Sequence, residues 1–170
     1  MGLNNSRNFD LLTLGQVLLR LSPPDNERLS RGDTFVKQVG GAELNVAVGA
    51  ALLGLHTGVI SKLPAHDIGS FMKGKIRSFG VSDDFFMYDQ SSSARVGIYY
   101  YENGAYPRKP KVIYDRNNSS FFSLNIDEIP EEVYTASKCF HTTGITLALN
   151  EDIRETTIDM IKRFKAAGTL

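Results

Sequence analysis

Two adjacent glycines, Gly40 and Gly41, separate a short alternating stretch from a strongly helical one. Residues 34–39 alternate as in a half-buried strand, and residues 42–53 consist mainly of helix formers that end at Gly54. The pair therefore predicts a tight connection from a strand into a helix. Without side chains there, backbone N–H groups at the helix N-terminus are open to a hydroxylated or carboxylated small molecule. The spacing alone suits a simple tight turn equally well.

Strand and helix patterns alternate along the rest of the chain. Residues 9–21 predict a buried strand followed by a second extended piece, and strands are also expected at 57–64 and 138–144. Helices are expected over 66–80, from Pro130 onward and over 151–167, the last of them capped by Asn150. One stripe of the helix over 42–53 is expected to consist of Leu44, Val48, Ala51 and Leu52. This order indicates an α/β fold whose mainly parallel sheet is covered by helices.

Two further segments depart from that alternation. Residues 94–104 and 111–117 are rich in β-formers and are joined by a proline-containing connector, which suggests an antiparallel excursion from the main sheet. Residues 169–170 follow Gly168, which is expected to cap the last helix, and predict the opening of another strand. We therefore expect the fold to continue beyond that position.

Composition limits the class of protein. The 170 residues suffice for one globular unit with a real core, and 19 basic residues balance 19 acidic ones, so nucleic acid is an unexpected partner. The single cysteine excludes an internal disulfide, and the first residues lack the basic flank and apolar run of a signal peptide. No apolar run reaches the roughly 20 residues of a membrane span. A cytoplasmic protein without membrane partners is the expectation.

Several polar candidates indicate little chemistry. The glycine spacing fits neither a dinucleotide fingerprint nor a P-loop, and the three histidines lack the spacing of a zinc site, so no metal ligand is predicted. His66 is expected in a helix cap. Asp83 and Asp84 are expected to face solvent, and Cys139 is expected to behave as a small buried hydrophobe.

Five segments together resemble a known family. They are GGAELNVAVGAALLG (40–54), LLTLGQVLLRLSPP (11–24), GIYYYE (97–102), VIYDR (112–116) and FHTTGITLALN (140–150). As a set they look like the N-terminal half of the PfkB, or ribokinase-like, carbohydrate kinases, and especially of 2-keto-3-deoxygluconate kinases. The resemblance covers essentially the whole chain.

The resemblance implies a fold, an activity and a set of ligand contacts. It implies that residues 1–170 form the substrate-binding part of a Rossmann-like (ribokinase-like) α/β domain, truncated, with a small β-sheet lid near 18–39 and 94–117. The implied activity is transfer of the ATP γ-phosphate to a sugar or sugar acid. Arg116 offers a planar fork for a carboxylate. The implied substrate-binding residues are Gly40, Gly41, Asn45, Tyr99, Tyr114 and Arg116.

Departures from the family pattern limit what this chain is expected to do. The family's late Gly-Ala-Gly-Asp motif, which supplies an anion hole and the catalytic base, does not occur among these 170 residues, and Asp33 in RGDTF stands in the wrong place to replace it. No catalytic residue is therefore predicted. Gln16 stands where the family usually has an acid. ATP and Mg²⁺ are implied only for the full-length family, and the chain alone is expected to be inactive.

Two alternatives remain open beside a sugar-acid kinase. One is a non-catalytic sugar-acid binding or interaction module, and the other is a fructokinase-like or nucleoside kinase, whose neutral ligand would make no use of Arg116. In each case a homo-oligomer formed through the lid or an exposed sheet edge is expected.

Overall fold

The main sheet contains five strands, all paired in parallel. The computed structural model describes residues 7–170. Residues 1–6 of the unit expected over 1–170 lie outside it, and so does part of the N-terminal segment that was compared with a signal peptide. β4 and β9 flank β1, and both β5 and β6 pair with the other side of β4. The expected α/β fold is confirmed. The strands are β1 (Phe9–Leu14), β4 (Thr57–Pro64), β5 (Val81–Ser82), β6 (Phe86–Asp89) and β9 (Ser137–His141).

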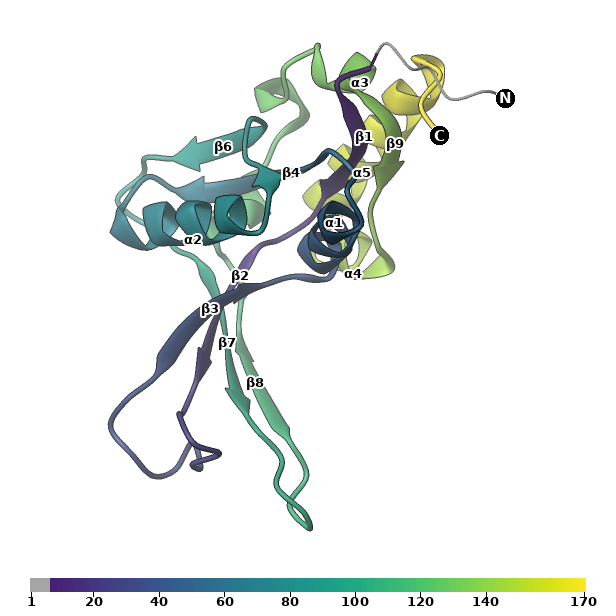
Figure 1. The fold of residues 1–170 in the computed structure, drawn as a ribbon. Coiled ribbons are helices and arrows are strands. Elements are labelled where there is room, and N and C mark those ends of the chain that lie inside the picture. Colours follow the sequence, from purple (N-terminus) through teal and green to yellow (C-terminus); the bar gives the residue numbers. More distant parts are fainter. Residues whose placement is uncertain (1–6) are drawn as a thin grey trace.

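Helices cover both faces of this sheet (Figure 1). One apolar cluster joins β4 to α1 (Ala42–Leu52) and α2 (Asp67–Ser78). The opposite cluster joins β1 to α5 (Glu151–Ala166), α3 (Val133–Ala136) and the short 3₁₀ turn η1 (Ser120–Ser123). Adjacent residues of a strand point to opposite faces, so Val59 enters the first cluster and Ile60 the second. The remaining short helices are η2 (Ile126–Glu128) and α4 (Gly144–Leu147).

The helix ends follow local sequence signals. Gly54 has a φ of 89°, the left-handed conformation expected of a C-terminal cap glycine. His66 caps α2 by accepting a hydrogen bond from the backbone N–H of Ile68, as predicted. Asn150 caps α5 in the same way through the N–H of Ile153. These caps fix where α1, α2 and α5 begin or end.

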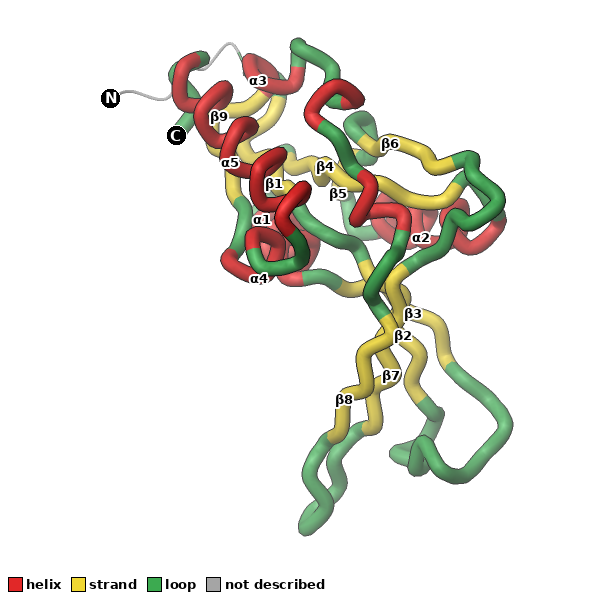
Figure 2. The backbone as a smooth tube through the Cα atoms, turned by 180° about the vertical axis from the view of Figure 1, so that it is seen from behind, coloured by secondary structure: helices red, strands yellow, loops and turns green. Residues whose placement is uncertain are grey.

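A second sheet of four strands projects away from the α/β body (Figures 1 and 2). Its order is β3-β2-β7-β8, with antiparallel pairs at both edges and a parallel pair between β2 and β7. The antiparallel pairing of the last two strands agrees with the predicted excursion. The outer strand β8 is exposed at all five residues. The strands are β2 (Leu18–Ser22), β3 (Val36–Gly40), β7 (Gly97–Glu102) and β8 (Lys111–Asp115).

Three local predictions were wrong. The helix expected to begin at Pro130 begins at Val133 instead and is only four residues long, because the buried start of β9 follows it at once. Asp83 does not face solvent, because Lys73 and Arg77, one turn apart on α2, both form ion pairs with it. Leu52 is 78% exposed, because it lies roughly 80° around the helix from the buried Leu44.

The end of the described chain lies beside β9. The backbone N–H of Leu170 donates to the carbonyl of Lys138 at 3.1 Å, and its carbonyl accepts from the N–H of Phe140 at 2.8 Å. Residue 170 therefore already has the pairing expected of a strand next to β9. Among the described residues, no helix combines the length and apolar character that crossing a membrane requires.

Candidate functional site

A cavity of about 440 Å³ lies where the two sheets meet. The chain passes from β1 into β2 through residues 15–17, so the start of the second sheet adjoins the carboxyl end of the first. Carboxyl ends of parallel strands are where α/β folds place their ligand sites. The walls come from the β1–β2 connection, the start of α1, strands β2, β7 and β8, and α4.

The start of α1 forms one wall of this cavity. Gly41 is the N-cap residue, with a φ of 147°, and a β-carbon there would lie 2.7 Å from the carbonyl oxygen of Gln16. Only glycine fits both constraints. Asn45 lies one turn further on and donates its backbone N–H to the carbonyl of Gly41 at 2.9 Å. The turn predicted for the glycine pair thus brings helix backbone to the cavity.

Gly40 has a different position from its neighbour. It does not line the cavity, but a β-carbon there would lie 2.5 Å from the hydroxyl oxygen of Tyr99. The missing side chain therefore makes room for a tyrosine that does line it. Burial raises the pKa of the Tyr99 hydroxyl, so it stays a neutral hydrogen-bonding group at ordinary pH.

The sheet wall of the cavity carries both aromatic and cationic side chains. Arg20 on β2 lies in register with Tyr99 on β7, which in turn pairs with Tyr114 on β8. The rings of Tyr99 and Tyr114 are 6.0 Å apart between centroids. The guanidinium of Arg20 lies 4.3 Å from the ring centroid of Tyr101. The wall thus combines flat apolar surfaces with hydroxyl and guanidinium donors, a combination suited to a polyhydroxylated ligand.

Arg116 directly follows β8 and lines the same cavity. Its Nε donates to Oε1 of Gln16 at 2.8 Å. Among residues 7–170, no Asp or Glu forms an ion pair with it. Burial lowers the pKa of this guanidinium, yet an arginine remains charged at neutral pH. The cavity therefore contains a partly desolvated cation that has no ion-pair partner within the described chain, although the charge of Glu43 in the same wall also acts on it.

Glu43 is the acidic residue in the cavity wall. It is 2% exposed, and its Oε1 accepts hydrogen bonds from the N–H and hydroxyl of Thr143 and from the hydroxyl of Thr146. These bonds connect the first turn of α1 to the start of α4. The acidic group is thus engaged in fixing the wall.

Five of the six residues singled out from the sequence lie around this one cavity, and Gly40 lies behind Tyr99. Their role in binding a substrate stays a prediction. The sequence reasoning did not single out Arg20 or Tyr101, although each stands two residues from another wall residue of its own strand. Alternation with a period of two was the signal that could have found them. The sequence reasoning also did not assign Gln16 or Glu43 to the wall of this cavity.

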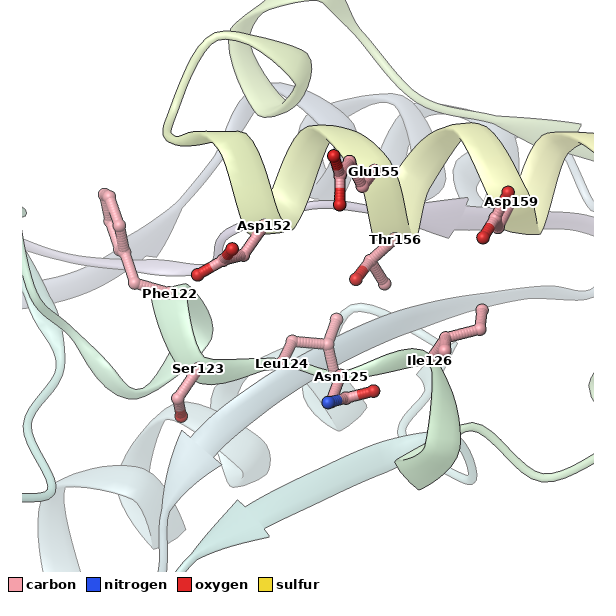
Figure 3. A pocket seen from close by; sticks show the side chains of 9 residues that line it. All are labelled: Phe122, Ser123, Leu124, Asn125, Ile126, Asp152, Glu155, Thr156 and Asp159. Atoms are coloured by element: carbon pink, nitrogen blue, oxygen red, sulfur yellow. The ribbon is translucent and has the colours of Figure 1, made fainter.

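A second cavity, of about 290 Å³, lies between α5 and residues 122–126 (Figure 3). Asp152, Glu155 and Asp159 line it from the helix, with Thr156 between them. This acidic lining disfavours an anionic ligand. Across residues 7–170, no group of three or more His, Cys, Asp or Glu side chains is arranged to hold a metal ion. The cavity at the sheet junction is therefore the better candidate for a sugar-acid site.

Comparison with known proteins gives consistent matches over almost the whole chain. The sequence model described as "pfkB family carbohydrate kinase" matches residues 8–169. A 2-dehydro-3-deoxygalactonokinase of Haloferax volcanii is 38% identical over 160 residues, which are 94% of this chain and 49% of that protein. The crystal structure of 2-dehydro-3-deoxygluconokinase from Thermotoga maritima is 34% identical, has a TM-score of 0.88, and is matched over 95% of this chain and 49% of its own.

A more distant structure shows the same fold. It is a sugar kinase of Pyrococcus horikoshii in complex with ATP, which is 24% identical with a TM-score of 0.81 over 94% of this chain and 51% of its own. The chain thus spans about half the length of the proteins that it matches.

Proposed function

The chain belongs to the pfkB family of carbohydrate kinases, and we propose that it forms the sugar-binding part of a kinase acting on a 2-keto-3-deoxy sugar acid. The phosphoryl acceptor would bind in the cavity at the junction of the two sheets. Two of the matched proteins are named as kinases of 2-dehydro-3-deoxy sugar acids. A sugar acid carries a carboxylate, and the cavity wall offers the guanidinium of Arg116 to such a group.

One observation carries this proposal, namely that the guanidinium of Arg116 has no ion-pair partner among the described residues. A half-buried guanidinium in the cavity wall that has no carboxylate as ion-pair partner favours a ligand with a negative charge of its own. The planar fork of an arginine matches a carboxylate in a bidentate arrangement. A neutral ketose or nucleoside would leave this charge without a partner, so the fructokinase-like and nucleoside kinase alternatives explain the site less well.

The other wall residues would orient the sugar. Tyr99 and Tyr114 offer ring faces to the carbon skeleton and hydroxyl groups to its oxygens, and Asn45 offers an amide. The backbone at Gly41 would approach the ligand closely because no side chain intervenes. In this proposal the projecting sheet acts as the lid of the site, with strands within the regions near 18–39 and 94–117.

ATP and Mg²⁺ would complete the reaction outside this part of the fold. The described residues offer no cluster for a metal ion, and the 170 residues contain no Gly-Ala-Gly-Asp. Phosphoryl transfer depends on positioned charges and an oriented acceptor hydroxyl. We infer that the phosphate donor uses the half of the family's length that this chain does not span. The chain alone should then bind the sugar acid without turning over ATP.

Calorimetric titration of the 170-residue chain tests the proposal. The ligands are 2-keto-3-deoxygluconate, fructose and adenosine, which represent the sugar acid, the neutral sugar and the nucleoside. The proposal predicts binding of the sugar acid in preference to both neutral compounds. Preference for fructose or adenosine would contradict it and favour the corresponding neutral-ligand kinase. A coupled ADP-release assay on the same sample would separate a binding module from a complete kinase.

A further inference from the structure

We propose that Gln16 is a positioning residue that selects for ligand charge, because it fixes Arg116 toward the cavity and adds no charge of its own. The inference rests on the proposed sugar-acid site. It concerns a side chain at the β1–β2 connection that is only 3% exposed. A buried amide is expected to use its donors and its acceptor in hydrogen bonds. The partners of the Gln16 amide are Arg116 itself and Ser119, three residues further along the chain.

Both ends of the Gln16 amide bind the segment that bears Arg116. Oε1 accepts from Nε of Arg116 at 2.8 Å, while Nε2 donates to the carbonyl of Arg116 at 3.2 Å and to the hydroxyl of Ser119 at 2.6 Å. The orientation of the amide follows from these partners. The reversed orientation would set an NH₂ group against Nε–H of the arginine and an oxygen against its carbonyl. Gln16 thus holds the side chain and the backbone of the same residue.

The surrounding residues leave room for this amide and for little else. A β-carbon at Gly97 would lie 2.7 Å from Nε2 of Gln16, so the glycine at the start of β7 makes space for it. The carbonyl of Gln16 occupies the space beside Gly41. One residue therefore contacts β7, the start of α1 and the end of β8. These are three of the elements that meet around the cavity.

The hydrogen bond to Nε leaves the far end of the guanidinium available. Within the described part of the chain, Nε is the nitrogen of this group that has a hydrogen-bond partner, and the terminal Nη atoms have none. A neutral amide oxygen restrains the arginine without cancelling its charge. A carboxylate in the same place would form an ion pair and reduce the attraction to an anionic ligand. The identity of residue 16 thus controls how much positive charge the ligand meets.

Two substitutions of nearly the same shape separate charge from hydrogen bonding. Gln16→Glu keeps an acceptor for Nε and adds a negative charge, whereas Gln16→Met removes the hydrogen bonds and adds none. The full chain with each substitution is titrated with 2-keto-3-deoxygluconate and with fructose, after a thermal melt has confirmed folding. The readout is the ratio of the two dissociation constants, which general loosening of the cavity would leave unchanged.

Gln16→Glu should reduce the preference for the sugar acid about tenfold or more, because the new charge competes for the same guanidinium. Gln16→Met should reduce it about threefold to tenfold, because Arg116 loses its preorganisation. An unchanged ratio in both variants, whether or not both ligands bind more weakly, would overturn the inference. Arg116→Ala separates this outcome from failure of the proposed function. If Arg116→Ala loses the preference for the sugar acid and the Gln16 variants keep it, the inference about Gln16 is contradicted and the proposed function stands. If Arg116→Ala keeps the preference, the proposed sugar-acid site itself is contradicted.

Discussion

Glu43 and Thr143 are hydrogen-bonded twice although they lie 100 positions apart in the chain. Oε1 of Glu43 accepts the backbone N–H of Thr143 at 3.2 Å and its hydroxyl at 2.5 Å. The hydroxyl of Thr146 is a third donor to the same oxygen at 2.8 Å. One buried acceptor thus joins the helix that follows the glycine pair to the short helix that follows β9.

Removing this acceptor should destabilise the fold. Glu43→Leu leaves the donors of Thr143 and Thr146 without their partner, which is expected to cost about 1 to 3 kcal/mol of unfolding free energy. Urea denaturation measures the change. Glu155→Leu on the exposed side of α5 is the matched control and should stay within about 0.5 kcal/mol of the parent.

A double-mutant cycle isolates the hydrogen bond itself. Thr146→Val keeps the shape of the side chain and removes its hydroxyl, so the pair with Glu43→Leu should show a coupling energy of about 0.5 kcal/mol or more. Strict additivity of the two changes would mean that the hydrogen bond between Thr146 and Glu43 adds nothing measurable to stability.

Asp83 and Asp84 offer a natural comparison of a buried and an exposed carboxyl group. Asp83 is 7% exposed and forms ion pairs with Lys73 at 3.1 Å and with Arg77 at 2.5 Å. Asp84 is exposed. Asp83→Asn should lower the unfolding free energy by about 1.5 to 3 kcal/mol, the range for hydrogen bonds to charged groups. Asp84→Asn should change it by less than about 0.5 kcal/mol. Equal effects would contradict the assignment.

The same pair predicts a pH dependence. Burial works against the charged form of Asp83, but hydrogen bonds from Arg77 and Lys73 outweigh it and hold the pKa of this carboxyl below its ordinary value. A lowered folded-state pKa stabilises the protein above the unfolded-state value of about 3.9. That stability is lost as the pH falls through the folded pKa. The difference between the parent and Asp83→Asn should therefore be full at pH 7 and shrink below about pH 4.

The main sheet and its helices were predictable because their signals are local. A dense apolar run marked β1, and the caps at Gly54 and Asn150 marked helix ends without knowledge of distant residues. The partners of Asp83 were missed because an exposed-looking carboxylate gives no sign that two cations of the preceding helix reach it. Likewise Leu52 fitted the apolar stripe by type, but its position around the helix carries it to the surface.

The candidate site was predictable only in part, because it depends on strand register. The glycine pair follows from the local turn and helix, while Asn45 and the other contacts came from the family resemblance. Arg20 reaches the wall because β2 pairs with β7, some 80 residues later in the chain, in the register that sets it beside Tyr99. The contact between Gln16 and Arg116 likewise joins residues 100 positions apart. No local pattern encodes such pairings.

Self-association through the projecting sheet is a further prediction. The edge strand β8 is exposed throughout, and Val112, Ile113 and Tyr114 are 42%, 44% and 60% exposed. Exposed apolar edge strands commonly pair with another chain. Light scattering coupled to size exclusion, across a tenfold dilution, should report a dimer or larger species and not the 18.8 kDa monomer. A single monomeric species with a cooperative melt would contradict this prediction.

The central claim is that Arg116 reads the negative charge of a sugar acid in the cavity between the two sheets. Calorimetric titration of the parent chain and of Arg116→Ala with 2-keto-3-deoxygluconate and fructose tests it most directly. Arg154→Ala, at an exposed ion pair on α5, serves as the control and should bind like the parent. Arg116→Ala should lose about 1.5 to 3 kcal/mol of binding free energy for the sugar acid and almost none for fructose. Equal losses for the two ligands, or no loss for either, would contradict the account.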